Sequence, residues 1–209
     1  MEKLLVINAH PKVDADSSVS LQVLHRFLET YKKTNPEGPI EQIDLYREHI
    51  PFVDRTFLSL QEKKGRNERL TDDERALDSR ISEILQQFKI AKKYVIAMPL
   101  HNFNIPSKLK DYMDNILIAK ETFAYTDNGS VGLLKDGRKV LVIQASDGIY
   151  TNNDWYTEVE YSHKFLKAMF NFMGVDDYQI IRAQGNFSLK REEVLTKAFQ
   201  EAGSIATSY

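Results

Sequence analysis

The sequence predicts an α/β protein in which five parallel strands form a doubly wound sheet with helices on both faces. Three segments, residues 3–7, 92–98 and 138–145, are almost entirely apolar, as expected of strands buried on both faces of a parallel sheet. Amphipathic helical patterns separate these segments, so strands and helices alternate along the chain. That alternation is typical of a sheet covered by its own connecting helices.

The other elements follow in chain order. Residues 40–46 and 178–184 are more amphipathic and are predicted to be strands nearer the sheet edges. Helices are predicted where apolar residues recur on one face, at residues 19–31, 71–88, 109–118, 161–172 and 192–205. Local signals support these boundaries: a capping-box pattern at Thr71 and Glu74, a first-turn proline at Pro106 and a helix end at Gly174. The order of elements favours a flavodoxin-like topology.

Composition limits the function. The chain has 209 residues, 42% hydrophobic and 28% charged, and is interpreted as one domain over residues 1–209, with the polar stretch 54–70 as an excursion from it. A net charge of −2 without a basic stripe argues against nucleic acid and anionic membranes as partners. With no cysteine, no signal peptide pattern and no segment of membrane-spanning length, a cytoplasmic location is expected.

Ligands of open parallel sheets lie beyond the carboxyl ends of the strands, so the loops there are the candidate site. After the first strand, Ser17, Ser18 and Ser20 lie at the start of a predicted helix, where free N–H groups and hydroxyls favour a phosphate. Any one of these serines could instead be an ordinary N-cap. Neither G-x-G-x-x-G nor G-x-x-x-x-G-K-[ST] occurs, so a monophosphate is favoured over a dinucleotide or a nucleoside triphosphate.

The loop that follows residue 98 combines amide, imidazole and aromatic groups in residues 100–104. Its amides suit the polar edge of a flat ring, and Phe103 suits the ring face. In the alternative interpretation, Asn102 and Asn104 cap the turn and His101 is only solvated. The loop that follows residue 144 leads to Tyr150, Trp155 and Tyr156, which line a pocket or form a subunit contact.

Other chemistries have less support in the sequence. The five histidines show no metal-binding spacing, so no metal site is predicted. No G-x-S-x-G nucleophile motif is present, although a hydrolase that uses Ser17 or Ser18 with His10 or His101 as its base stays an open alternative.

Two long segments resemble the bacterial FMN-dependent NADH azoreductases, also described as NADH:quinone oxidoreductases. The segment PLHNFNIPSKLKDYMD, which begins at Pro99, resembles the family pattern P-[ML]-x-N-F-x-[IV]-P-x-x-L-K-x-[YW]-[IM]-D. The segment TFAYTDNGSVGL, which begins at Thr122, resembles T-F-x-Y-T-x-N-G-x-x-G-L.

The similarity covers nearly the whole chain. It implies bound FMN, NADH or NADPH as the electron donor, and ping-pong two-electron transfer to a quinone or azo compound. It also implies a homodimer with the site at the subunit interface.

The resemblance also implies the site residues. The positions that would contact FMN are His10, Ser18, Val19, Ser20, Leu100, His101, Asn102, Phe103, Ala145, Ser146, Asp147 and Gly148. The candidates for the walls of the substrate pocket are Phe57, Tyr125 and Tyr150. The flavin would carry the redox chemistry, so no catalytic side chain is named.

The chain departs from the family pattern at three places. His10 replaces a serine, Ala145 to Asp147 replace S-R-G, and Lys120 or Glu121 stands where the family has a glycine. Two alternatives to the enzyme therefore stay open. One is a flavodoxin-like FMN-binding or regulatory protein with little turnover, and the other is a Ser/His hydrolase on the same scaffold.

Overall fold

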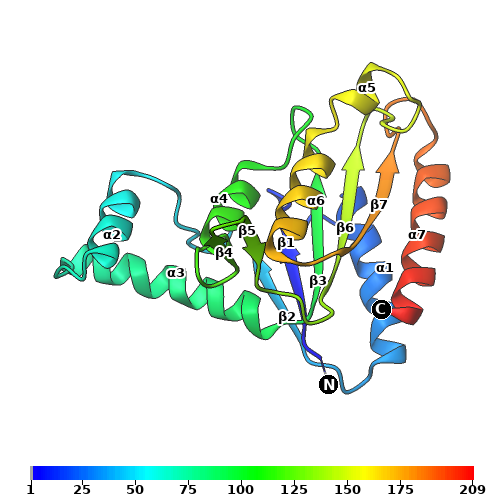
Figure 1. Cartoon of the computed structure of the whole chain (residues 1–209). Coiled ribbons are helices and arrows are strands. Elements are labelled where there is room, and N and C mark those ends of the chain that lie inside the picture. The colour runs from blue at the N-terminus through cyan, green and yellow to red at the C-terminus, as the bar shows by residue number, and fades with distance from the viewer. Residues whose placement is uncertain (1) are drawn as a thin grey trace.

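The centre of the computed structural model, which describes residues 2–209, is a five-stranded sheet in the order β2-β1-β3-β6-β7 (Figure 1). Its strands are β1 (Leu4–Asn8), β2 (Ile40–Asp44), β3 (Lys93–Pro99), β6 (Lys139–Ser146) and β7 (Asp177–Gln184). Every pairing in this sheet is parallel. The three apolar runs are the inner strands, and the two amphipathic segments are the edge strands, as predicted. Inner strands are covered by helices on two faces, which is why their side chains are apolar throughout.

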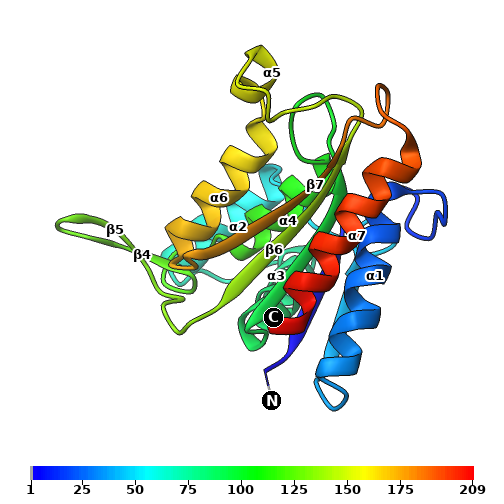
Figure 2. The ribbon, with the colours of Figure 1, turned by 90° about the vertical axis from the view of Figure 1, so that its right-hand side faces the viewer.

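Alternate residues of each strand point into two separate hydrophobic clusters. On β1, Leu5 and Ile7 pack with α3 (Asp72–Ile90), α4 (Ser107–Ile116) and α6 (Tyr161–Met173). Leu4 and Val6 pack instead with α1 (Val19–Thr34) and α7 (Arg191–Ser208). Figure 2 shows α1 and α7 side by side in front of the sheet. Each buried apolar residue of the five-stranded sheet therefore contributes to one of the two clusters.

The helix boundaries follow from local chemistry. The Thr71 hydroxyl accepts a hydrogen bond from Glu74 N–H at 3.2 Å, and the Glu74 carboxylate accepts one from Thr71 N–H at 2.8 Å, so the predicted capping box is present. Gly174 ends α6 with φ of 95°, as expected of a helix-ending glycine. Pro106 lies at the N-cap of α4, one position before the first turn where it was expected.

The excursion at residues 54–70 contains a helix, α2 (Arg55–Gly65), that packs on α3. Phe57 and Leu60 of α2 pack against Ile81 of α3, and this contact buries the apolar side chains of the excursion. In Figure 1 this pair of helices extends to the left of the sheet. Leu58 stays more than half exposed on the outer side of α2.

Two further elements were not predicted. An antiparallel hairpin is formed by β4 (Phe123–Thr126) and β5 (Gly129–Gly132), and it projects from the body of the molecule in Figure 2. The short helix α5 (Trp155–Glu158) lies above the carboxyl ends of the strands in Figure 1. Both elements are too short to show a period in the sequence. Among residues 2–209, every helix is too short or too polar to cross a bilayer.

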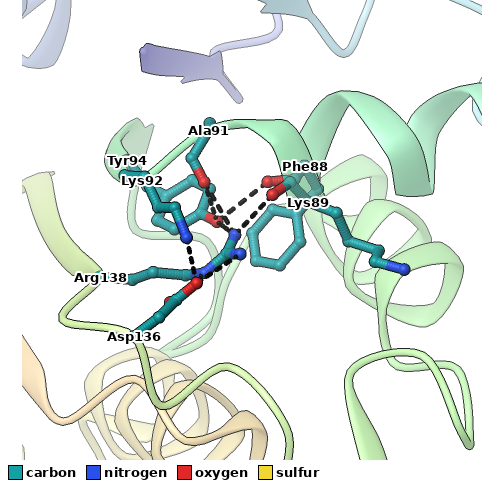
Figure 3. A network of polar contacts seen from close by, with 7 residues as sticks. All are labelled: Phe88, Lys89, Ala91, Lys92, Tyr94, Asp136 and Arg138. Atoms are coloured by element: carbon teal, nitrogen blue, oxygen red, sulfur yellow. Dashed lines mark hydrogen bonds and ion pairs between the residues drawn. The ribbon is translucent and has the colours of Figure 1, made fainter. Parts of the chain in front are cut away.

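A polar network closes the amino-terminal end of the strands (Figure 3). The buried Arg138 donates hydrogen bonds to the carbonyl groups of Lys89 and Ala91 and to the hydroxyl of Tyr94, each at 2.8 Å. Its guanidinium also pairs with Asp136, and this pairing is the largest cause that lowers the pKa of Asp136 to about 2. Arg138 thereby satisfies carbonyl groups at the carboxyl end of α3 that the helix itself leaves unpaired.

Candidate functional site

The loop after β3 makes a tight turn at residues 101–104. His101 N–H donates to the Asn104 carbonyl at 2.9 Å, and Asn104 N–H donates to the His101 carbonyl at 2.8 Å. The two central residues, Asn102 and Phe103, have φ angles of 46° and 65°. Positive φ is uncommon for asparagine and unusual for a bulky aromatic residue, and such backbone strain clusters at functional sites. The N–H groups of Asn102 and Phe103 have no hydrogen-bond partner among the described residues.

The loop after β6, residues 146–148, is held by its carbonyl groups. Asn186 N–H and its Nδ2 both donate to the Ser146 carbonyl, at 3.3 and 2.8 Å. Phe187 N–H donates to the Asp147 carbonyl at 3.3 Å. Gly185 N–H donates to the Gly148 carbonyl at 3.2 Å.

This arrangement fixes the direction of the N–H groups in the same loop. In a trans peptide the N–H points opposite to the carbonyl of the preceding residue. The N–H groups of Asp147 and Gly148 therefore point away from residues 185–187, and neither has a partner within residues 2–209. Leu100 N–H donates to the Ala145 carbonyl at 2.8 Å, which joins this loop to the one after β3.

The first turn of α1 offers a third group of donors. Ser18 is the N-cap, and its hydroxyl accepts a long bond of 3.4 Å from Leu21 N–H and lies 3.2 Å from the Ser20 hydroxyl. The N–H groups of Val19 and Ser20 precede the first intrahelical bond and are unpartnered within the described chain. Together with the partial positive charge of the helix end, they suit an anion. The N-cap role of Ser18 is therefore compatible with the predicted phosphate role of this turn, which stays a prediction.

A surface cavity of about 380 Å³ lies beside these donors, and its volume falls within the range of ligand pockets. It is lined by His10, Pro11, Lys12, Ala15, Ser17, Ser18, Pro99 and His101. Burial is the main cause that lowers the pKa of His10, a hydrogen bond with the Lys12 backbone opposes it, and the charge of His101 lowers the pKa further. A larger groove of about 470 Å³ lies between α1 and α7, but none of the three site loops lines it.

Aromatic side chains border the other end of the site. The Phe103 ring packs edge-to-face against Trp155, with ring centroids 5.4 Å apart, and lies 6.4 Å from Tyr150. Gly148 lies close to this cluster, because a Cβ at that position would be 3.3 Å from the Tyr150 ring. The structure therefore brings Tyr150 to the turn at residues 101–104, as the pocket prediction requires.

Two predicted pocket residues lie elsewhere in the same chain. Phe57 is buried in the small core between α2 and α3. Tyr125 is 76% exposed on the projecting β4–β5 hairpin. In Figure 1, α2 lies at the far left, away from the loops above the strands. Their role as pocket walls stays a prediction.

Residues 185–187 were missed as part of the site. They follow the fifth strand, which ends at the same edge of the sheet as the others, and the dipeptide Gly185-Asn186 is a turn signal. Inspecting the loop after every predicted strand would have found them. Their contacts to residues 146–148, however, are invisible in a linear sequence.

The structure gives a Ser/His hydrolase no assembled pair. His10 Nδ1 contacts the Lys12 backbone, 3.0 Å from its N–H and 2.9 Å from its carbonyl, and no hydrogen bond joins His10 or His101 to Ser17, Ser18 or Ser20 in the part of the chain described. Within residues 2–209 no three His, Asp or Glu side chains gather as a metal site would require.

Fold and site together define a flavodoxin-like protein, and comparison with known proteins agrees. A family model described as flavodoxin-like fold matches residues 2–205. The chain is 64% identical over 208 residues to FMN-dependent NADH:quinone oxidoreductase 1 of a Bacillus cereus strain, covering 99% of this chain and 98% of that one. The chain therefore belongs to the flavodoxin-like family of FMN-dependent NADH:quinone oxidoreductases.

Solved structures show the same relationship. An FMN-dependent NADH-azoreductase from Bacillus anthracis strain Ames Ancestor, in complex with FMN, is similar with a TM-score of 0.98 and 62% identity, covering 100% of this chain and 99% of that one. An azoreductase from Bacillus anthracis strain Sterne is similar with a TM-score of 0.93 and 31% identity, covering 100% of both chains.

Proposed function

We propose that this protein is an FMN-dependent NADH:quinone oxidoreductase that also reduces azo compounds. One observation carries the proposal: two loops from the adjacent strands β3 and β6 present unpartnered N–H groups, those of Asn102 and Phe103 and those of Asp147 and Gly148, among the described residues. The edge of an isoalloxazine ring carries oxygen and nitrogen acceptors that such donors would bind. The names of the relatives and the FMN complex of the Bacillus anthracis azoreductase support the same cofactor.

The first turn of α1 fits the phosphate of FMN. The N–H groups of Val19 and Ser20 and the hydroxyl of Ser18 would donate to its oxygens. His10, which lines the cavity, would add an imidazole N–H in place of the family's serine hydroxyl. Leu100, His101 and the segment from Ala145 to Gly148 complete the proposed cofactor site.

The chain's own residues position the reactants and exclude water. When bound, FMN supplies the two-electron chemistry by which NADH gives up a hydride and a quinone takes up two electrons and two protons. The donors at residues 102–103 and 147–148 would hold the ring edge in one orientation. Tyr150 and Phe103 would border the space that the nicotinamide and the acceptor occupy in turn, which is the basis of ping-pong kinetics. NADPH is the alternative donor.

We propose further that two chains form a dimer with the site at their interface. Tyr125 is largely exposed on a hairpin that projects from its own chain (Figure 2), and Leu58 on α2 is also exposed. Contiguous apolar surface marks protein–protein contacts, and we propose that these two segments contribute to one. Tyr125 and the α2 segment that carries Phe57 would then border the site of the second copy.

Residues 1–209 are proposed to form one doubly wound domain. Support comes from the family match over residues 2–205 and from the two clusters that share one sheet. Because NADH is held inside the cell, we place the reaction in the cytoplasm.

The test is an absorption spectrum of purified protein mixed with FMN and desalted, followed by anaerobic addition of NADH. Retained flavin bands that bleach with NADH are the expected result. Bands that do not bleach would favour an FMN-binding protein without turnover, and the loss of all flavin would overturn the proposal. Asn102→Ala keeps the backbone N–H but should weaken retention, because alanine tolerates the left-handed φ at this position less well than asparagine. His25→Ala, in the α1–α7 groove, is the matched control that should not.

A further inference from the structure

A buried carboxylate lies next to the site and has no role in the proposed chemistry. Glu160, between α5 and α6, is only 3% exposed. It accepts hydrogen bonds from Nε and Nη2 of Arg182, each at 2.8 Å, and from Nε2 of Gln144 at 2.9 Å. A two-pronged arginine–carboxylate pair fixes both orientation and distance. An ion pair of this kind offsets the free-energy cost of burying a charge. Here it also holds the Glu160 side chain in one orientation.

Hydrogen bonds run from Glu160 to the strained turn. The Oε1 atom of Gln144 accepts from the Ser162 hydroxyl at 2.7 Å. The backbone N–H of the same serine donates to the Phe103 carbonyl at 3.2 Å. Ser162 is fully buried, so no water competes for either contact. A continuous series of polar contacts therefore connects Arg182 on β7 to the turn at residues 101–104.

The turn needs this support because of its backbone. Asn102 and Phe103 adopt left-handed φ angles that a non-glycine residue keeps only when its surroundings hold it there. The N–H groups proposed to bind the flavin belong to these same two residues. The carbonyl that Ser162 holds belongs to the next peptide unit, between Phe103 and Asn104, so this contact fixes the end of the short turn that carries both donors.

We propose that Glu160 is a positioning residue, which acts through Gln144 and Ser162 to hold the donors of Asn102 and Phe103 against the flavin ring. This inference rests on the proposed function. It assigns to Glu160, Gln144 and Ser162 a part in cofactor binding although none of them belongs to the three loops of the site.

The test compares Glu160→Gln, Ser162→Ala and a matched control, Asp136→Asn. Asp136 also partners a buried arginine, Arg138, but at the opposite end of the strands (Figure 3). Ser162→Ala removes one hydroxyl and no charge, so it carries the test even if Glu160→Gln does not fold.

Three quantities are measured: the FMN dissociation constant, the melting temperature of the apoprotein and the emission of Trp155. Trp155 is the chain's only tryptophan and contacts Phe103, so its emission reports on the turn without flavin.

We expect Glu160→Gln to weaken FMN binding about tenfold and Ser162→Ala about threefold, the scale of losing buried hydrogen bonds to a charged and to a neutral group. Both variants should shift the emission of Trp155 in the apoprotein. Asp136→Asn should lower the melting temperature and leave both other quantities unchanged. If the wild-type protein binds FMN, and Glu160→Gln and Ser162→Ala bind it equally well, the positioning role is overturned and the proposed function stands. If wild-type protein binds no FMN, the proposed function is overturned together with it.

Discussion

At the scale of single residues, two positions where the family has glycine behave differently. Lys120 has φ of 70°, in the left-handed region where glycine has no steric penalty. Asp147 is not among the residues with positive φ, so its backbone does not require glycine. Of Lys120 and Glu121, the two candidates for the glycine position of the family pattern, Lys120 is the one whose backbone favours glycine. At position 147, the difference that matters is the exposed negative charge.

Replacing Lys120 by glycine should stabilise the protein. Relief of left-handed strain is worth about 1 kcal/mol, and the greater freedom of glycine in the unfolded chain offsets part of it. We expect an increase of about 0.5 kcal/mol in the free energy of unfolding, measured by urea titration of the apoprotein. Asp147→Gly is the control and should not stabilise. If Lys120→Gly and Asp147→Gly changed the free energy of unfolding equally, the left-handed φ of Lys120 would not be the cause.

Replacing Asp147 by glycine should instead act on FMN binding. The carboxylate is exposed near the proposed site, and FMN carries a negatively charged phosphate, so removing the carboxylate should tighten binding about threefold at low salt. The gain should fade at high salt, because ions screen exposed charges. Dissociation constants from flavin fluorescence at two salt concentrations measure this. An unchanged constant at both would mean that the charge does not reach the flavin.

At the scale of elements, the α2–α3 pair depends on one buried carboxylate. The Lys63 amine, the Ser59 hydroxyl and the backbone N–H of Thr71 all donate to Glu74, each at 2.8 Å. These contacts, with Lys63 the largest cause, lower the pKa of Glu74 from 4.5 to about 2. Glu74 therefore joins a capping box within α3 to the packing of α2, which has little other contact with the body of the molecule.

This arrangement predicts a dependence of stability on pH. Because the pKa of Glu74 is lower in the folded than in the unfolded state, its contribution is complete above about 4.5 and is lost as the pH falls from there towards about 2. Glu74→Gln should be less stable at pH 7 and should show a shallower loss over that interval. Urea unfolding from pH 7 to pH 2.5 measures both proteins. Parallel curves would exclude Glu74 as a source of acid sensitivity.

At the scale of the whole molecule, the exposed hairpin predicts an assembly. Wild-type protein should sediment at twice the mass of one chain. Tyr125→Asp should shift the protein towards one chain and reduce turnover, because a charge cannot be buried at an interface without a partner. Ile90→Asp is the control, since Ile90 is also an exposed apolar residue but lies at the end of α3, at the amino-terminal side of the sheet. If Ile90→Asp separated the two chains and Tyr125→Asp did not, the interface would lie away from the β4–β5 hairpin.

The linear sequence was sufficient for the sheet and for choosing the loops that are proposed as the site. Buried strands show as apolar runs, capping residues such as Thr71 and Glu74 act within one turn, and the three loops follow directly from strand ends. These features depend on residues that are close together in the chain. The short hairpin and α5 were missed, because four residues are too few to show a period.

Only the tertiary structure showed which N–H groups at the candidate site have no partner among the described residues. The carbonyl groups of residues 146–148 are held by a loop about forty residues later, and the Phe103 carbonyl is held by Ser162. The tertiary structure also separates the φ of Lys120 from that of Asp147, which look alike as departures from a pattern. Hydrogen-bond direction and backbone strain arise from contacts between segments that are distant in sequence, so no local pattern of residues could have specified them.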